Sequence, residues 1–144
     1  MKRIVASLLI ALPLLVVTSP ALADDEAEVG ACLRLIATER MPEGLRPVSS
    51  DLKTLLLMKE SVYSFTLFAG NSYQIHTCAG PNVTDLDTYL YDQAGKLLQA
   101  QTDVDRSPSV NIKPETTGTY YLVVKLLDTG DAKPGSVGYV QLYE

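Results

Sequence analysis

Residues 120–126, Tyr-Tyr-Leu-Val-Val-Lys-Leu, decide the fold class of this chain. An apolar side chain stands at every second position, from Tyr120 through Leu122 and Val124 to Leu126. Successive side chains of a β-strand point to opposite faces, so these four line one side of a long strand. Because that side must be buried against a second layer, the segment predicts a layered β-protein.

Seven further short runs of strand-like composition surround this segment. They are residues 55–58, 63–67, 72–77, 86–91, 96–101, 110–112 and 139–143. Turn residues separate the runs, and Gly70-Asn71 predicts a hairpin between 63–67 and 72–77. Seven or eight short strands within about 95 residues indicate an all-β domain, an antiparallel and jelly-roll-like β-sandwich over residues 50–144.

The segments between the runs are expected to be connectors and loops. Residues 46–50 read as a connector into the sandwich, and residues 128–138, with three glycines and a proline, read as a loop. Binding residues concentrate in long loops on a rigid sheet. We therefore expect the contact surface at 102–109 and 128–138.

Residues 24–49 precede the sandwich as an N-terminal segment and connector. The spacing i, i+3, i+4, i+7 of its apolar residues favours a helix over about residues 24–41. These residues are Val29, Cys32, Leu33 and Ile36. Ala31, Leu33, Leu35 and Ala37 also alternate, so a strand over 27–40 stays open as the alternative.

Residues 1–23 have the pattern of a secretory signal peptide. Lys2 and Arg3 are followed by an apolar run over 4–17 and by a small-residue site that ends at Ala23. The run is too short to span a bilayer permanently, so no integral membrane segment is expected after cleavage. The sequence thus predicts a periplasmic or secreted bacterial protein that begins near Asp24.

Charge excludes several classes of partner. Without residues 1–23 the chain has ten basic and seventeen acidic residues, a net charge of −7. An acidic surface with no stripe of Lys or Arg repels phosphate backbones and anionic lipids. We expect no nucleic-acid partner and a protein or glycan ligand that the sequence does not identify.

Cys32 and Cys78 are the two cysteines of the chain. In an exported protein an isolated pair is usually a disulfide, and closing a loop of about 45 residues stabilises the fold by roughly 4 kcal/mol. The alternative is a metal shared by both sulfurs and the only histidine, His76. A disulfide is the prediction.

Three segments together resemble the bacterial pre-peptidase C-terminal domain. They are 62–70 (Val-Tyr-Ser-Phe-Thr-Leu-Phe-Ala-Gly), 84–95 (Thr-Asp-Leu-Asp-Thr-Tyr-Leu-Tyr-Asp-Gln-Ala-Gly) and 117–124 (Thr-Gly-Thr-Tyr-Tyr-Leu-Val-Val). The resemblance covers about residues 50–144 and implies a β-sandwich of the kind usually appended to secreted peptidases, here expected as a stand-alone copy. Eight tyrosines fit a sandwich core, and a tyrosine-lined sugar platform is the alternative interpretation.

Four aspartates are candidate calcium ligands. Asp85 and Asp87 flank one strand residue, and Asp103 and Asp105 repeat that spacing in a loop. Calcium requires six to eight oxygen ligands. Collagen-binding domains similar to the family bind calcium partly through the corresponding Asp-x-Asp tract. The alternative is that these carboxylates cap turns. No other cofactor is expected, since phosphate loops and zinc spacings are missing from the sequence.

Catalysis would have to use His76. No Gly-x-Ser-x-Gly motif accompanies it, and a Cys78–His76 dyad requires a free thiolate. The sequence therefore favours a non-catalytic binding module. A calcium-stabilised adhesion or matrix-binding domain and a small hydrolase using His76 are the two alternatives.

Overall fold

The structure, a computed structural model, describes residues 20–144, with side chains placed from residue 24 onward. The predicted signal peptide lies outside the described residues except for 20–23, which form the first turn of helix α1 (Pro20–Arg40). Its cleavage after Ala23 stays a prediction. Among the described helices, none is long and apolar enough to cross a membrane.

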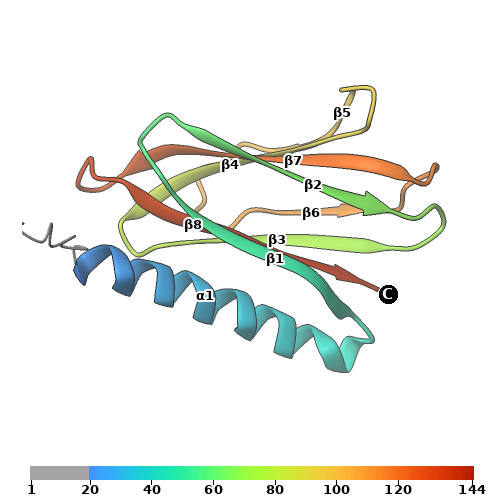
Figure 1. Cartoon of the computed structure of the whole chain (residues 1–144), viewed down its shortest axis with the longest axis horizontal. Coiled ribbons are helices and arrows are strands. Elements are labelled where there is room, and N and C mark those ends of the chain that lie inside the picture. Colours follow the sequence, from blue (N-terminus) through green and yellow to red (C-terminus); the bar gives the residue numbers. More distant parts are fainter. Residues whose placement is uncertain (1–19) are drawn as a thin grey trace, which may run out of the picture.

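The described part contains eight antiparallel strands in two four-stranded sheets that pack face to face (Figure 1). The sheet orders are β1-β8-β3-β6 and β2-β7-β4-β5. The strands are β1 Arg46–Leu55, β2 Glu60–Leu67, β3 Tyr73–Ala79, β4 Val83–Tyr91, β5 Leu97–Gln101, β6 Ser109–Ile112, β7 Gly118–Thr129 and β8 Gly135–Tyr143. The predicted antiparallel β-sandwich is confirmed.

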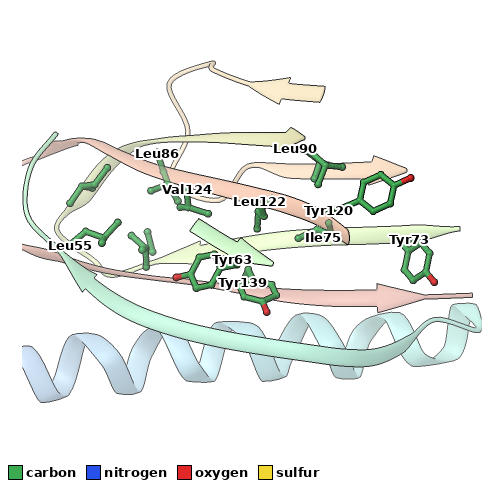
Figure 2. Packing of buried hydrophobic residues seen from close by; sticks show 14 of the residues in the cluster. Leu55, Tyr63, Tyr73, Ile75, Leu86, Leu90, Tyr120, Leu122, Val124 and Tyr139 are labelled. Atoms are coloured by element: carbon green, nitrogen blue, oxygen red, sulfur yellow. The ribbon is translucent and has the colours of Figure 1, made fainter. Parts of the chain in front are cut away.

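The core lies between the sheets and follows from the alternation in β7 (Figure 2). Tyr120, Leu122, Val124 and Leu126 are at most 4% exposed. They belong to one buried cluster with apolar residues of both sheets, including Ile75 of β3. Burying each Leu- or Val-sized side chain contributes roughly 1.5–3 kcal/mol, so this one strand supplies a large share of the driving force for folding.

Helix α1 covers the outer face of the β1-β8-β3-β6 sheet (Figure 1). The predicted apolar stripe faces this sheet, where Val29 and Leu33 are buried and pack in one cluster with Val140 and Leu142 of β8. The helix is therefore confirmed, and the alternative of a strand over 27–40 is wrong.

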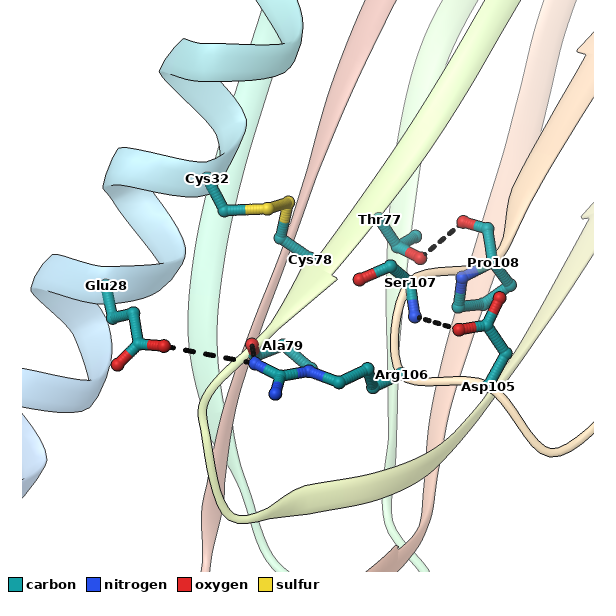
Figure 3. The surroundings of a disulfide bond; sticks show 9 residues. All are labelled: Glu28, Cys32, Thr77, Cys78, Ala79, Asp105, Arg106, Ser107 and Pro108. Carbon is teal, nitrogen blue, oxygen red and sulfur yellow. Dashed lines mark hydrogen bonds and ion pairs between the residues drawn. A yellow bond between two sulfur atoms is a disulfide. The ribbon is translucent and has the colours of Figure 1, made fainter.

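A disulfide joins Cys32 of α1 to Cys78 of β3, as predicted (Figure 3). The alternative of a metal held by these two sulfurs is wrong, because they are bonded to each other. The cysteines are 46 residues apart. In the loop-closure model, a cross-link of this span stabilises the folded chain by about 4 kcal/mol.

Arg106 attaches the loop before β6 to the same region (Figure 3). Its guanidinium donates a 3.1 Å hydrogen bond to the carbonyl oxygen of Ala79 and lies 4.0 Å from the carboxylate of Glu28 on α1. At the far edges of the sheets, Gln99 of β5 exchanges two hydrogen bonds with the main chain of Asn111 in β6. These contacts close that side of the sandwich.

The hairpin predicted at Gly70-Asn71 is wrong, although the chain does reverse there. Gly70 has a left-handed φ of 87°. However, β2 pairs with β7, whereas β3 pairs with β8 and β6, so the reversal carries the chain from one sheet to the other. A turn fixes only the local change of direction, and the partner of each strand depends on which apolar faces it helps to bury.

The connector predicted over 46–50 is the first half of β1. β1 is an edge strand with exposed side chains on both faces, so the alternation that reveals a strand is missing from its sequence. The adjoining apolar run 55–58 is a strand only at Leu55. Leu56 and Met58 are 60% and 59% exposed in the following turn.

The loop predicted over 128–138 shortens to residues 130–134. β7 continues to Thr129 and β8 begins at Gly135. Gly135 lies in a strand and allows close packing, because a Cβ at this position would lie 2.5 Å from a methyl group of Val83. Glycine content alone therefore misplaced the ends of both strands.

Gly138 of β8 provides a test of how closely α1 and β1 approach β8. A Cβ there would lie 2.9 Å from both the carbonyl oxygen of Asp51 and Cδ1 of Leu33. We expect Gly138→Ala to lower the free energy of unfolding by about 1–3 kcal/mol in urea denaturation, because it overpacks this contact. The control is Gly130→Ala, whose added Cβ meets no atom closer than 3.8 Å. Equal losses in both variants would contradict the close approach.

Candidate functional site

Asp85 and Asp87 lie near the start of β4, where the pairing with β7 is irregular. The register shifts on both sides of Asp85. Asp87 is 5% exposed, and one of its carboxylate oxygens accepts a 2.7 Å hydrogen bond from the hydroxyl of Tyr89. The other oxygen, Oδ1, is buried without a hydrogen-bond partner among the described residues, as is Oδ1 of Asp85. The Asp87 carboxylate is thus bonded through one oxygen only.

The second predicted pair lies in the exposed loop 102–108. Asp105 caps its own turn, since its carboxylate accepts the Ser107 N–H at 3.0 Å, and its carbonyl accepts the Leu86 N–H at 2.9 Å. Asp103 is exposed. Within residues 24–144, no three side chains of His, Cys, Asp or Glu come together as a metal site. The structure thus does not gather the four aspartates into one cluster.

The predicted contact loops both lie beside the start of β4. Loop 102–108 reaches it through the bond between Asp105 and Leu86. In loop 130–134, Asp131 and Pro134 accept hydrogen bonds from the side-chain amide of Asn82 at 3.2 and 3.1 Å. Loop 102–108 is therefore anchored to β4 itself, and loop 130–134 to the residue that precedes β4.

His76 lies on β3, and its Nε2 is 3.1 Å from the amide oxygen of Gln74. Burial, followed by the positive charge of Arg40, lowers the pKa of His76, and Glu43 opposes this shift. A Cys78–His76 dyad is not available, because Cys78 is held in the disulfide. His76 therefore lacks the thiolate nucleophile that this dyad requires.

The outer face of the β2-β7-β4-β5 sheet presents aromatic and aliphatic side chains in cross-strand rows, whereas α1 packs on the other sheet. One row is Val62, Val123, Tyr89 and Ala100, and the next is Ser64, Tyr121, Tyr91 and Leu97. The exposed fractions of Val62, Leu97 and Tyr121 are 52%, 47% and 36%. We call the six large residues the tyrosine face: Val62, Tyr89, Tyr91, Leu97, Tyr121 and Val123.

Asp87 connects the acidic start of β4 with the tyrosine face. Its hydrogen bond, followed by burial, raises the pKa of Tyr89 to about 12, so the phenol keeps its proton at physiological pH. The row next to Tyr89 is charged and consists of Glu60, Lys125 and Asp87. The tyrosine face is thus bordered by charge at one end, and one of its rings is oriented by a buried carboxylate.

The sequence profile of the bacterial pre-peptidase C-terminal domain matches residues 60–126. Residues 60–126 thus resemble this family in sequence. The pre-peptidase C-terminal domain of collagenase from Bacillus anthracis has a similar fold, with a TM-score of 0.53 and 14% identity over 65% of this chain and 87% of that chain. No match is found among curated proteins.

The matched residues include most of the strands that form the tyrosine face. β2, β4 and β5 lie within the matched residues, as does β7 as far as residue 126. Helix α1, β1 and β8 lie outside them, so the disulfide joins the matched region to a helix that precedes it. Domains of this family are typically non-catalytic C-terminal accessory domains of secreted proteases.

The sequence raised a tyrosine-lined sugar platform only as an alternative and did not indicate which tyrosines would form it. Four of the eight tyrosines, including Tyr63 and Tyr120, are at most 6% exposed, as expected of core residues. Tyr89 and Tyr91 are two positions apart and so share a side of one strand, which was the available signal. Placing Tyr121 opposite Tyr91 requires the register between β4 and β7, which composition does not give.

The lowered pKa of His76 predicts a loss of stability in acid. Unfolded histidine titrates near pH 6.5, so the unfolded chain takes up this proton first as the pH falls. We expect the wild type to lose more free energy of unfolding than His76→Gln between about pH 7.5 and 5.5, measured by equilibrium denaturation. Parallel losses in the two proteins would show that His76 titrates alike in both states.

Proposed function

We propose that the chain is an exported, non-catalytic binding module that holds a protein or an envelope glycan on the tyrosine face. The proposal rests on one observation. The outer face of the β2-β7-β4-β5 sheet presents three tyrosines and three aliphatic side chains, aligned in rows across neighbouring strands. Tyrosine provides apolar contact area together with a hydroxyl that hydrogen-bonds at the edge of a contact, which suits both sugar rings and polypeptide. The ligand's identity is the part that needs experiment.

Three observations support export and an accessory role. The leader-like residues 1–23 predict secretion. The Cys32–Cys78 disulfide fits an oxidising compartment. Domains of the matched family occur in secreted bacterial proteases. The alternative of a hydrolase using His76 is disfavoured, because the bonded Cys78 removes the nucleophile on its own strand face.

Tyr121 offers a matched test of the tyrosine face. We expect Tyr121→Ala to reduce binding to envelope material by at least about tenfold, which is a loss of about 1.4 kcal/mol. Co-sedimentation with purified peptidoglycan measures the glycan ligand, and cross-linking in the envelope protein fraction measures a protein ligand.

The control for this test is Tyr143→Ala. Tyr143 is 37% exposed, almost the same as Tyr121, but it lies in the other sheet. Equal effects of the two substitutions would count against the tyrosine face. Turnover of a hydrolase substrate that disappears in His76→Ala would overturn the non-catalytic assignment.

Calcium stabilisation is a second candidate property of the same module. It is favoured by the buried, unpartnered oxygens of Asp85 and Asp87, since a carboxylate oxygen without a partner is costly to bury. Calcium accepts carboxylate and main-chain carbonyl oxygens together with water, so a site here does not need three acidic side chains. The register shifts around Asp85 interrupt the regular exchange of main-chain hydrogen bonds between β4 and β7 at this point.

If calcium binds there, millimolar calcium raises the melting temperature of chelator-treated protein by several degrees, because a ligand at 100 times its Kd stabilises by about 2.7 kcal/mol. We expect Asp87→Asn to abolish this increase. Glu39→Gln, which changes an exposed acid on α1, leaves it intact. Identical melting curves of the wild type in calcium and in chelator would exclude a structural ion.

A further inference from the structure

A mostly apolar groove of about 480 Å³ runs between helix α1 and strand β1, on the side opposite the tyrosine face. Gly30, Leu33 and Arg34 line it from the helix, and Ser50 and Leu52 line it from the strand. Figure 1 shows α1 and β1 running alongside each other at this edge of the sandwich. The groove is separate from the proposed ligand face and does not depend on it.

The strand side of the groove is an unpaired sheet edge. β1 is the terminal strand of its sheet and pairs only with β8 in the described chain. The Asp51 carbonyl oxygen lies close to Gly138 of β8. Successive residues of a strand direct their main-chain N–H and C=O groups to opposite sides, so those of Leu52 point away from β8. The Leu52 N–H donates instead to the carboxylate of Asp51 at 2.9 Å. By alternation, Ser50 and Thr54 also direct their main-chain groups outward.

Gly30 keeps the helix side of the groove open at a cost in stability. Glycine is less favourable than alanine inside a helix, because it loses more backbone entropy on folding. Packing does not demand it, because the nearest atom to an added Cβ is the movable guanidinium of Arg34 at 3.3 Å, followed by Leu52 at 3.9 Å. Gly138, by contrast, faces three atoms within 3.0 Å. Gly30 therefore maintains space that the folded chain itself does not fill.

Arg34 places a positive charge at this groove. Its guanidinium lies above Gly30 and has no ion pair or side-chain hydrogen bond with residues 24–144. Arg40 on the same helix is instead paired with Glu43 at 2.9 Å. An unpaired guanidinium beside apolar surface is suited to bind a carboxylate through two parallel hydrogen bonds.

We propose that this groove binds an extended peptide, which adds as a strand to β1 and places a carboxylate on Arg34. Strand addition uses the main-chain groups of Ser50, Leu52 and Thr54, while an apolar side chain of the peptide fills the space above Gly30. Because the Arg34 guanidinium is positively charged, the groove selects peptides that carry a carboxylate at this position. Asp51 occupies the Leu52 N–H in the free protein and must release it, so Asp51 competes with the peptide.

The test selects ligands from two displayed libraries of random decapeptides, one with free C-termini and one with C-termini blocked by a linker. Selected peptides are then measured on the purified, disulfide-bonded protein by fluorescence anisotropy. Enrichment from the free library alone identifies a C-terminal carboxylate, and enrichment from both identifies an acidic side chain. Either pattern supports the proposal when binding follows the substitutions below.

Three substitutions have different expected effects on the selected peptides. Arg34→Gln weakens binding at least about tenfold. Gly30→Leu fills the groove and abolishes binding, while the melting temperature stays equal or rises because leucine is the better helix former. Asp51→Ala strengthens binding several-fold, since it removes both the competing acceptor and a like charge. Arg40→Gln is the matched control and leaves binding unchanged.

Several results would overturn the proposal. They are the absence of enrichment from either library, equal binding by wild type and Arg34→Gln, and weaker binding by Asp51→Ala. Sedimentation that shows a dimer dissociated by Leu52→Pro would assign the edge to a second copy of this chain instead. If Gly30→Leu does not fold, the two single variants Gly30→Ala and Arg34→Gln still distinguish a loss of peptide binding from a loss of folding stability.

Discussion

The attachment of helix α1 to β3 is the constraint on which the arrangement of surfaces depends. The Cys32–Cys78 bond and the buried stripe around Leu33 commit the outer face of one sheet to the helix. As a result, the two sheets have different roles: one is covered, and the other leaves Tyr89, Tyr91 and Tyr121 facing solvent. The same helix also forms one wall of the groove along β1. Both proposed binding surfaces therefore follow from where a single helix is fixed.

The sequence correctly predicted those helices and strands that bury one face and leave the other more exposed. The alternation from Tyr120 to Leu126 and the helical spacing of Val29 and Leu33 were both correct for this reason. β1 escaped prediction because most of its residues are exposed at the sheet edge, and so its sequence carries no alternating pattern. The hairpin at Gly70 was wrong because a turn residue encodes a reversal but not the sheet that receives the chain.

The candidate sites show the same limit. Asp85 and Asp87 could be singled out by spacing, yet their buried oxygens arise from an irregular pairing of β4 with β7 that no spacing reveals. The tyrosine face requires three separate registers, and only the Tyr89–Tyr91 repeat is visible within one segment. Gly30 was not singled out from the sequence, because its surroundings include Leu52, which lies in a strand more than twenty residues later.

The covalent link between α1 and β3 also changes how the protein responds to proteolysis. Residues 41–43, which join the helix to β1, form a short 3-10 turn with no buried residue and are accessible to a protease. A cut there severs the main chain, but both fragments stay joined through the two sulfurs, with the helix still seated by its apolar stripe. The two pieces thus stay together after a nick at this junction until a reductant separates them.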